Sequence, residues 1–207
     1  MNAHGIIACL GNPGSQYEGT RHNMGFAVAD ALRKRLGHMP VPEPEPLPGG
    51  RFQSLLWRCV LPGCDAPWLL AMPQTFMNLS GDAVQPLMAW YKLKPCQLLV
   101  VHDDIDLAPG RLKLKWSGGT AGHNGLKSIA ARLGTQDFHR LRVGVGRPPD
   151  AGNVIPWVLG HFSAEPKALV EAALPEAVDA ILHFALDGPA RAANTVNTRR
   201  KTAEASA

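Results

Sequence analysis

The chain has 207 residues, of which 45% are hydrophobic, with 21 Lys and Arg against 17 Asp and Glu. This length and apolar content predict one globular domain, and the four cysteines form no CxxC pair, so neither a zinc site nor a disulfide framework is indicated. No secretory signal pattern and no apolar run of about 20 residues is visible, so we expect a soluble cytoplasmic protein that does not associate with membranes. The net charge of +4 permits a polyanionic partner without requiring one.

The first predicted unit is a strand, a loop and a helix. Residues 5–10 (GIIACL) are typical of a buried strand, Gly and Pro residues then break it, and a helical pattern covers residues 23–36. Ligands of open α/β sheets bind beyond the carboxyl ends of the strands, so this loop is a candidate site. The loop lacks both the GxGxxG of dinucleotide-binding proteins and the GxxxxGK[ST] of nucleoside triphosphatases. It offers polar side chains instead of bare backbone.

The next stretch predicts a loop, a hairpin and a helix. Residues 40–50 (PVPEPEPLPGG) are too rich in Pro and Gly for regular structure and are expected to form an extended surface loop. Residues 52–60 and 68–72 read as the two strands of a hairpin. Ser80 is expected to cap a helix, in which Pro86 causes a kink or a late start.

The second half of the chain alternates strands and helices. A wholly apolar strand at residues 98–101 is followed at once by His102, Asp103 and Asp104. Residues 111–116 alternate apolar and basic side chains, which places Lys113 and Lys115 on one face of a strand.

Three helices and one more strand complete the prediction. We expect an amphipathic helix at residues 124–133 closed by Gly134, and a short strand at 141–145. Two helices follow, at 164–186 with a kink at Pro175 and from 189 to about 200.

This order of elements predicts an α/β fold. We expect a single three-layer domain over residues 1–193, with a mixed, mostly parallel twisted sheet flanked by helices, and a polar C-terminal tail over residues 194–207. Because Asn12, Asn78 and Asp103 each follow a predicted strand, they should meet at one edge of the sheet.

Five motifs, in one order, resemble those of bacterial peptidyl-tRNA hydrolase. They are LGNPGSQYEGTRHNMG at 10–25, MPQTFMNLSG at 72–81, VHDDIDL at 101–107, GTAGHNGLKS at 119–128 and FHRLRVGVGRP at 138–148. The resemblance covers about residues 5–197, and the ordered set is far more specific than any one motif. It implies a monomeric enzyme without cofactor or metal, which hydrolyses the ester between a peptide and the 3′-terminal ribose of tRNA and so recycles tRNA from prematurely released chains.

The resemblance assigns catalysis to His22, Asp103 and Asn78. An imidazole, whose ordinary pKa is about 6.5, takes a proton from water at cytosolic pH. A carboxylate such as Asp103 fixes the tautomer of this base and stabilises the imidazolium that forms. The amide of Asn78 would donate a hydrogen bond to the developing oxyanion, a role for which Asn12 is the second choice.

Binding roles follow from the same resemblance. Asn12 and Asn124 would hold the peptide backbone and position water, while Tyr17, Phe76 and Met77 would line the groove near the ester, with Tyr17 available to stack on a base of the terminal CCA. A phosphate clamp for tRNA, distant from the ester, would consist of Lys113, Lys115 and Arg142.

Taken singly, several of these residues have simpler explanations. Asn12 is a common turn residue, and Asn78 fits the start of a helix. Lysines on a strand more often form a solvated face than a phosphate site. His123 is more simply a residue that caps or packs beside the following helix, and His102 should point away from Asp103.

Two other functions stay open at this point. A non-catalytic RNA-binding module is the main alternative, because plant organellar intron-splicing proteins resemble this fold, but such a module has no need for His22, Asp103 and Asn78. An aminopeptidase-like or purine-nucleosidase-like hydrolase would require metal ligands or a phosphate loop; Asp103 and Asp104 are adjacent, but the further oxygen ligands of a hard cation are not evident nearby.

Overall fold

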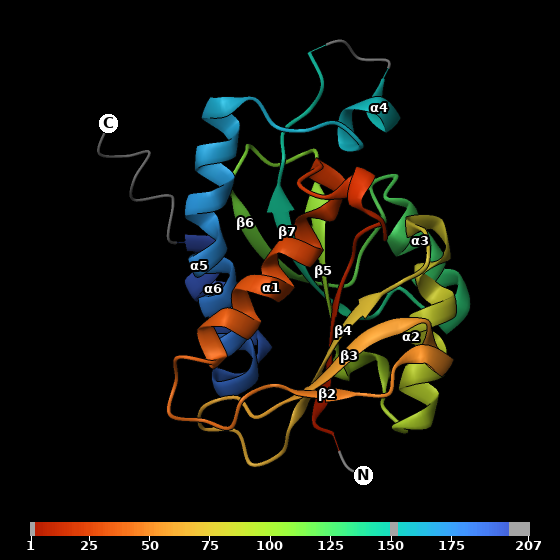
Figure 1. Cartoon of the computed structure of the whole chain (residues 1–207), viewed down its shortest axis with the longest axis vertical. Helices are drawn as coiled ribbons and strands as arrows, with labels where there is room; N and C mark the ends of the chain where they lie inside the picture. The colour runs from red at the N-terminus through yellow and green to blue at the C-terminus, as the bar shows by residue number, and fades with distance from the viewer. Residues whose placement is uncertain (1–2, 150–152, 199–207) are drawn as a thin grey trace.

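The computed structural model describes residues 3–149 and 153–198, which form a seven-stranded mixed sheet between two layers of helices (Figure 1). The strand order is β2-β3-β4-β1-β5-β7-β6. Four parallel strands make the centre: β4 (Trp68–Pro73), β1 (Gly5–Cys9), β5 (Leu98–Asp104) and β7 (His139–Gly144). Antiparallel strands complete the two edges: β2 (Glu45–Leu47) and β3 (Ser54–Cys59) on one side, β6 (Leu112–Trp116) on the other.

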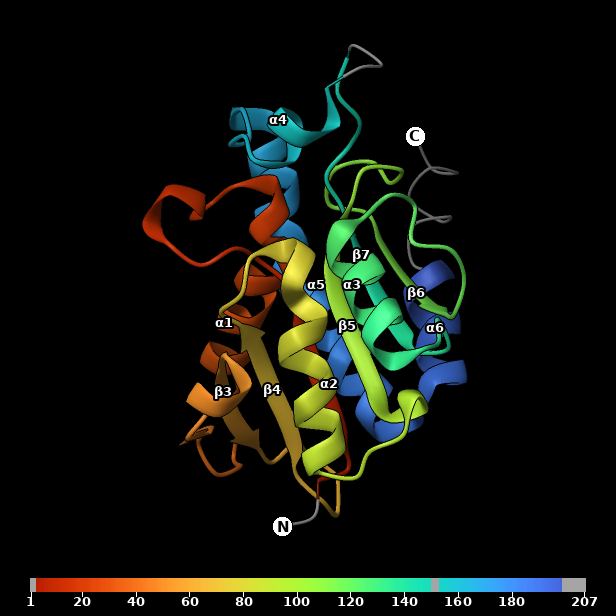
Figure 2. The same ribbon diagram turned by 90° about the vertical axis from the view of Figure 1, so that its right-hand side faces the viewer.

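The helices cover both faces of this sheet (Figures 1 and 2). One face carries α1 (Met24–Leu36), α5 (Ala164–Asp187) and α6 (Pro189–Thr198), and the other carries α2 (Ser80–Trp90) and α3 (Asn124–Leu133). Alternation along β1 explains the two cores: Ile7 and Cys9 pack in the first, Ile6 and Ala8 in the second. The predicted three-layer α/β class is confirmed.

Short helices occupy the loops. Five are 3-10 helices, and the sixth, α4 (Val154–Val158), stands at the carboxyl edge of the parallel strands (Figure 2). The 3-10 helices in the described chain are η1 (Ser15–Tyr17), η2 (Arg21–Asn23), η3 (Gly50–Phe52), η4 (Met77–Leu79) and η5 (Pro95–Gln97). Of these, η2 and η4 matter most, because they connect the strand ends to the helices that follow.

The loop predicted for residues 40–50 is wrong in part, because it contains the edge strand β2 and begins η3. Pro46 pairs with Trp57 of β3. An edge strand needs ladder hydrogen bonds on one side only, so a proline whose nitrogen faces outward is tolerated there. Proline content therefore excluded a central strand but not an edge strand.

The start of α2 also differs from the prediction. Ser80 is the first helical residue and not the cap, which is Leu79, and the Ser80 hydroxyl donates to the Met77 carbonyl at 2.8 Å. Because the helix begins there and contains Pro86, the predicted late start is wrong.

The C-terminal helices agree with the prediction as far as they are described. Helix α5 continues through Pro175, where the predicted kink stays a prediction, and α6 is described as far as Thr198. The Asn197 side chain binds both the backbone N–H and the carbonyl of Leu114, each at 3.0 Å, and so attaches α6 to β6. The tail proposed for 194–207 thus overlaps α6 at 194–198, and its remainder lies outside the described residues. Along the described chain, no helix combines the length and apolar character needed to cross a bilayer.

Candidate active site

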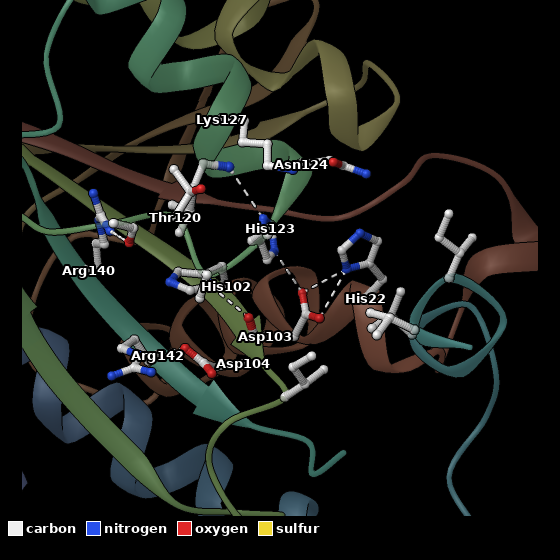
Figure 3. A pocket seen from close by; sticks show the side chains of 18 of the residues that line it. His22, His102, Asp103, Asp104, Thr120, His123, Asn124, Lys127, Arg140 and Arg142 are labelled. Carbon is white, nitrogen blue, oxygen red and sulfur yellow. Dashed lines mark hydrogen bonds and ion pairs between the residues drawn. The ribbon is translucent and has the colours of Figure 1, made fainter. Parts of the chain in front are cut away.

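A buried histidine–aspartate pair lies at the carboxyl edge of the parallel strands (Figure 3). His22, in η2, places its Nδ1 at 2.9 and 3.0 Å from the two carboxylate oxygens of Asp103, near the end of β5. His22 and Asp103 are 8% and 2% exposed to solvent. A carboxylate only accepts hydrogen bonds, so the proton of neutral His22 sits on Nδ1 and Nε2 is left as the proton acceptor.

Gly25 permits this close approach. A Cβ at Gly25 would lie 2.3 Å from the Leu10 carbonyl oxygen and 2.6 Å from that of Val101, far inside contact distance. Glycine therefore allows the first turn of α1 to touch β1 and β5, which brings the preceding η2 with His22 to the end of β5.

A second histidine binds the same carboxylate. His123 Nε2 lies 3.0 Å from Asp103 Oδ1, while its Nδ1 accepts the backbone N–H groups of Gly125 and Leu126 as the N-cap of α3. The predicted capping role is confirmed, but the sequence analysis missed the contact with Asp103. Burial alone would raise the pKa of Asp103; the hydrogen bonds that it accepts from His123 and His22 outweigh burial and hold that pKa well below its usual range.

His102 packs behind this group. Its Nδ1 donates to the backbone carbonyl of Asp103 at 2.6 Å, and its ring meets that of His123 edge-on with centroids 4.8 Å apart. Burial, followed by the neighbouring His123, lowers the pKa of His102 to about 3, so this ring is neutral. It packs against the His123 ring and does not bind the carboxylate of Asp103.

Asn12 joins two of the loops at the sheet edge. Its side-chain oxygen accepts the Met77 backbone N–H at 2.7 Å, and its own backbone N–H and carbonyl are held by the Asn23 side chain at 2.8 and 3.0 Å. The amide of Asn12 is thereby fixed, with its oxygen committed to η4. Asn23, which the sequence analysis did not single out, fixes the backbone.

Tyr17, Phe76 and Asn78 lie on η1 and at η4, and none of them is among the described residues that line the pocket around His22. Phe76 is 54% exposed and meets the half-buried Tyr17 ring edge-on, with centroids 6.4 Å apart. Met77 is buried beneath them. Asn78 is exposed on η4, and the structure does not bring it into contact with His22 or Asp103.

One pocket of about 650 Å³ extends from the pair (Figure 3). Asn124 lines it at the start of α3, and the residues Gly119 to Gly122 border it. The apolar part of the lining includes Val154, Ile155 and Val158, from α4. Among the described residues that line this pocket, the hydroxyl group belongs to Thr120, and no serine or cysteine is present.

Basic side chains from β6 and β7 lie along the same pocket. The register pairs Lys113 with Arg142 and Lys115 with Arg140, and both lysines are exposed. Arg142 Nε binds Asp104 Oδ2 at 2.5 Å. The phosphate clamp predicted to lie distant from the ester stays a prediction. Lys115 and Arg142 line the pocket that also contains His22, whereas Lys113 lies outside its lining.

Helix α4 is held beside the pair by Arg21. The guanidinium lies 3.6 Å from the centroid of the Trp157 ring and donates to the carbonyls of Trp157 and His161 at 3.1 and 3.0 Å. Because Arg21 directly precedes His22, one short segment carries His22 and also holds the apolar residues of α4 beside the pocket. Neither α4 nor this contact was predicted from the sequence.

Three groups lie close enough to surround a cation, namely His22, Asp103 and His123, whose ligand atoms are within 4.8 Å of one another. The facing nitrogens, however, both bind the carboxylate of Asp103, and His123 Nδ1 is used by α3. A cation would have to replace these hydrogen bonds, so we interpret the cluster as a hydrogen-bonded network.

The fold and site together define an α/β protein with the histidine–aspartate pair that hydrolases use as a general base. A sequence model described as peptidyl-tRNA hydrolase matches residues 6–204. Peptidyl-tRNA hydrolases from Nitratidesulfovibrio vulgaris (strain DP4) and Syntrophomonas wolfei are 50% and 44% identical, over 97% and 93% of this chain and 100% and 99% of theirs. The crystal structure of peptidyl-tRNA hydrolase from Acinetobacter baumannii superimposes with a TM-score of 0.84 at 32% identity, covering 95% of this chain and 97% of that one. The chain belongs to the peptidyl-tRNA hydrolase family.

Proposed function

We propose that this chain hydrolyses the ester bond between the peptide and the 3′-terminal ribose of peptidyl-tRNA, with His22 as the general base. The observation that carries the proposal is the buried pair itself, in which Asp103 accepts the Nδ1 proton of His22 and leaves Nε2 unprotonated. This arrangement needs only water as the second substrate.

The reaction proceeds through a tetrahedral intermediate. His22 Nε2 takes a proton from water as the oxygen attacks the ester carbonyl, and Asp103 stabilises the imidazolium. The proton then passes to the ribose oxygen as the carbon–oxygen bond breaks, which releases the peptide acid and tRNA with its terminal hydroxyl. Asn78, whose exposed amide stands on η4 at the same edge, is the proposed donor to the oxyanion, a contact that typically lowers the barrier by about 3 kcal/mol.

The substrate is proposed to lie across the pocket and the neighbouring loops that carry Tyr17 and Phe76. The Tyr17 and Phe76 rings suit the flat face of a terminal base. Asn12 and Asn124 suit the peptide backbone and the attacking water, and the buried Met77 is proposed to lie near the ester. The phosphate contacts are assigned to the row of cations at Lys113, Lys115 and Arg142.

The cellular compartment is proposed from the nature of this substrate. Peptidyl-tRNA that leaves the ribosome prematurely arises in the cytoplasm, so we place the chain there, acting as a monomer that returns tRNA to translation. A non-catalytic RNA-binding role gives no reason for a buried histidine bonded to a buried carboxylate, since desolvating a charge costs free energy that mere RNA binding does not require.

The experiment compares an N-acetylated aminoacyl-tRNA with its unblocked counterpart, in the presence of a chelator. We expect hydrolysis of the blocked substrate alone, because its amide mimics a peptide bond, whereas the free α-amino group is charged. Tight tRNA binding without hydrolysis would support the RNA-binding alternative, and loss of activity in the chelator would point to a metal at the His22 cluster.

A further inference from the structure

We propose that His123 is a positioning residue for the His22–Asp103 pair: held as one neutral tautomer by α3, it donates a hydrogen bond to Asp103 and so sets how strongly His22 holds its proton. The inference rests on the proposed function, in which His22 is the base. It assigns His123 a role beyond capping the helix.

The first turn of α3 determines which nitrogen of His123 carries the proton. Nδ1 accepts the backbone N–H groups of Gly125 at 3.1 Å and Leu126 at 3.3 Å, and an accepting nitrogen has no proton. The proton of the neutral ring is therefore on Nε2, 3.0 Å from Asp103 Oδ1. Protonating Nδ1 would place a donor against two donors at the positive end of a helix, which favours the tautomer with its proton on Nε2.

Asp103 consequently shares its charge between two imidazoles. Oδ1 accepts from His123 Nε2 and from His22 Nδ1, and Oδ2 lies 3.0 Å from His22. A carboxylate that already accepts one N–H attracts a second donor less strongly. His123 therefore weakens the stabilisation that Asp103 gives to the His22 imidazolium.

The other charged and titratable groups nearby are turned elsewhere. On β5, His102 is neutral and Asp104 is bound to Arg142. On η2, Arg21 lies against Trp157, and the pocket-lining residues of α4 are apolar. Farther along the pocket stand the cations of β6, α3 and β7, which are Lys115, Lys127 and Arg140. Among the described residues, His123 is thus the group besides His22 whose side chain binds the Asp103 carboxylate.

The test separates the two roles of His123 by substitution. Asparagine caps helices as well as any residue but is too short to span to Asp103, so His123→Asn keeps the cap and removes the carboxylate contact. His123→Ala removes both. We expect the Asn variant to melt close to the wild type, whereas its kcat/KM profile on N-acetylated aminoacyl-tRNA shows an acid limb displaced upward by about 0.5 to 1 pH unit, which is a roughly three- to tenfold loss on the acid side.

A second readout needs no substrate. NMR titration of the histidine ring signals should show His123 as the Nε2–H tautomer throughout, and a His22 titration midpoint that moves to higher pH in His123→Asn. Coincident His22 titrations in a folded Asn variant and the wild type would overturn the inference and leave His123 a cap alone. If the wild type shows no hydrolysis, the proposed function fails, but the NMR comparison still decides the role of His123.

Discussion

At the scale of single residues, Asp103 is the group that joins the two imidazoles of the site. It is 2% exposed, and its carboxylate accepts hydrogen bonds from the imidazoles of His22 and His123. A buried carboxylate with two N–H partners stays ionised and holds both rings in position. The other nitrogen of His123 is bound by the first turn of α3, whereas that of His22 is the proposed acceptor for water.

Replacing this carboxylate by an amide should abolish most of the activity. In Asp103→Asn, one of the two oxygens becomes an NH₂ group that cannot accept from an imidazole, so one ring must flip its tautomer or lose its partner. Hydrolysis of N-acetylated aminoacyl-tRNA should fall by about 10³ to 10⁴, as in other triads that lose this carboxylate, with tRNA affinity retained. Asp106→Asn is the matched control, because Asp106 is exposed and bound to Arg147. Turnover of Asp103→Asn within tenfold of this control would show that hydrolysis does not depend on the Asp103 carboxylate.

Sequence motifs identified those site residues that lie shortly after a predicted strand or within one loop. His22 and Asp103 follow predicted strands inside specific motifs, and the structure joins them. The contact of His123 with Asp103 was not predictable, because it depends on how α3 packs against β5, and a single histidine before a helix reads simply as a cap. The role of Asn78 remains a prediction, because its amide is exposed and is not in contact with His22 or Asp103.

At the scale of elements, the approach of α1 to the sheet positions the base. Gly25→Ala would place a methyl group 2.3 Å from the Leu10 carbonyl oxygen, so either α1 or β1 must shift. Overpacking of this kind typically costs about 1 to 3 kcal/mol of stability, and urea unfolding should show that loss together with reduced hydrolysis. Gly37→Ala at the end of the same helix is the control: its Cβ would find no atom nearer than 3.6 Å, so stability should stay within about 0.5 kcal/mol. Equal stabilities of the two variants would contradict this packing argument.

Strand β6 should contribute salt-dependent affinity for tRNA. Lys113 and Lys115 are exposed on one face of β6, whereas Arg142 is bound to Asp104, so changing the lysines disturbs the fold least. Lys113→Gln with Lys115→Gln should weaken tRNA binding and reduce the slope of log K against log salt by about one for each phosphate that the variant no longer neutralises. The control double variant, Lys92→Gln with Lys94→Gln, removes the same charge near the amino ends of the strands. Equal reductions in affinity in the two double variants would argue against a localised clamp.

Most elements were predictable because their patterns are local. Residues 5–10, 98–101 and 124–133 carry unbroken apolar runs or a helical period, and each forms the expected element. Two elements, β2 and α4, were not predicted. Pairing with β3 makes β2 a strand despite its prolines, and contacts with Arg21 hold the five-residue α4, so both depend on distant partners.

For the molecule as a whole, buried histidines make stability depend on pH. His139 packs between Trp116 and Phe184, and burial lowers its pKa from 6.5 to about 4. Between these values the unfolded chain binds a proton that the folded chain does not, so stability is fully present above pH 6.5 and is lost as the pH falls toward 4. At pH 5 the loss of stability from His139 alone is about 2 kcal/mol.

Urea unfolding at pH 7 and pH 5 checks this contribution. His139→Phe keeps an aromatic ring between Trp116 and Phe184 but cannot titrate, so its stability should fall by about 2 kcal/mol less than that of the wild type between the two pH values. Part of the dependence should remain, since His102 also has a lowered pKa. The exposed His38 provides the control in His38→Gln, whose pH dependence should match the wild type. A pH dependence unaltered by His139→Phe would mean that other groups are responsible.

The central claim is that His22 removes a proton from water in ester hydrolysis, and single-turnover kinetics with enzyme in excess test it most directly. The rate of release of N-acetylated amino acid from tRNA is compared between the wild type and His22→Ala, with tRNA affinity measured on the same preparations. We expect the rate constant to fall by about 10² to 10⁴ while the affinity changes less than about threefold. A His22→Ala rate within a few-fold of the wild type would contradict the account, because the water would then be activated by another group.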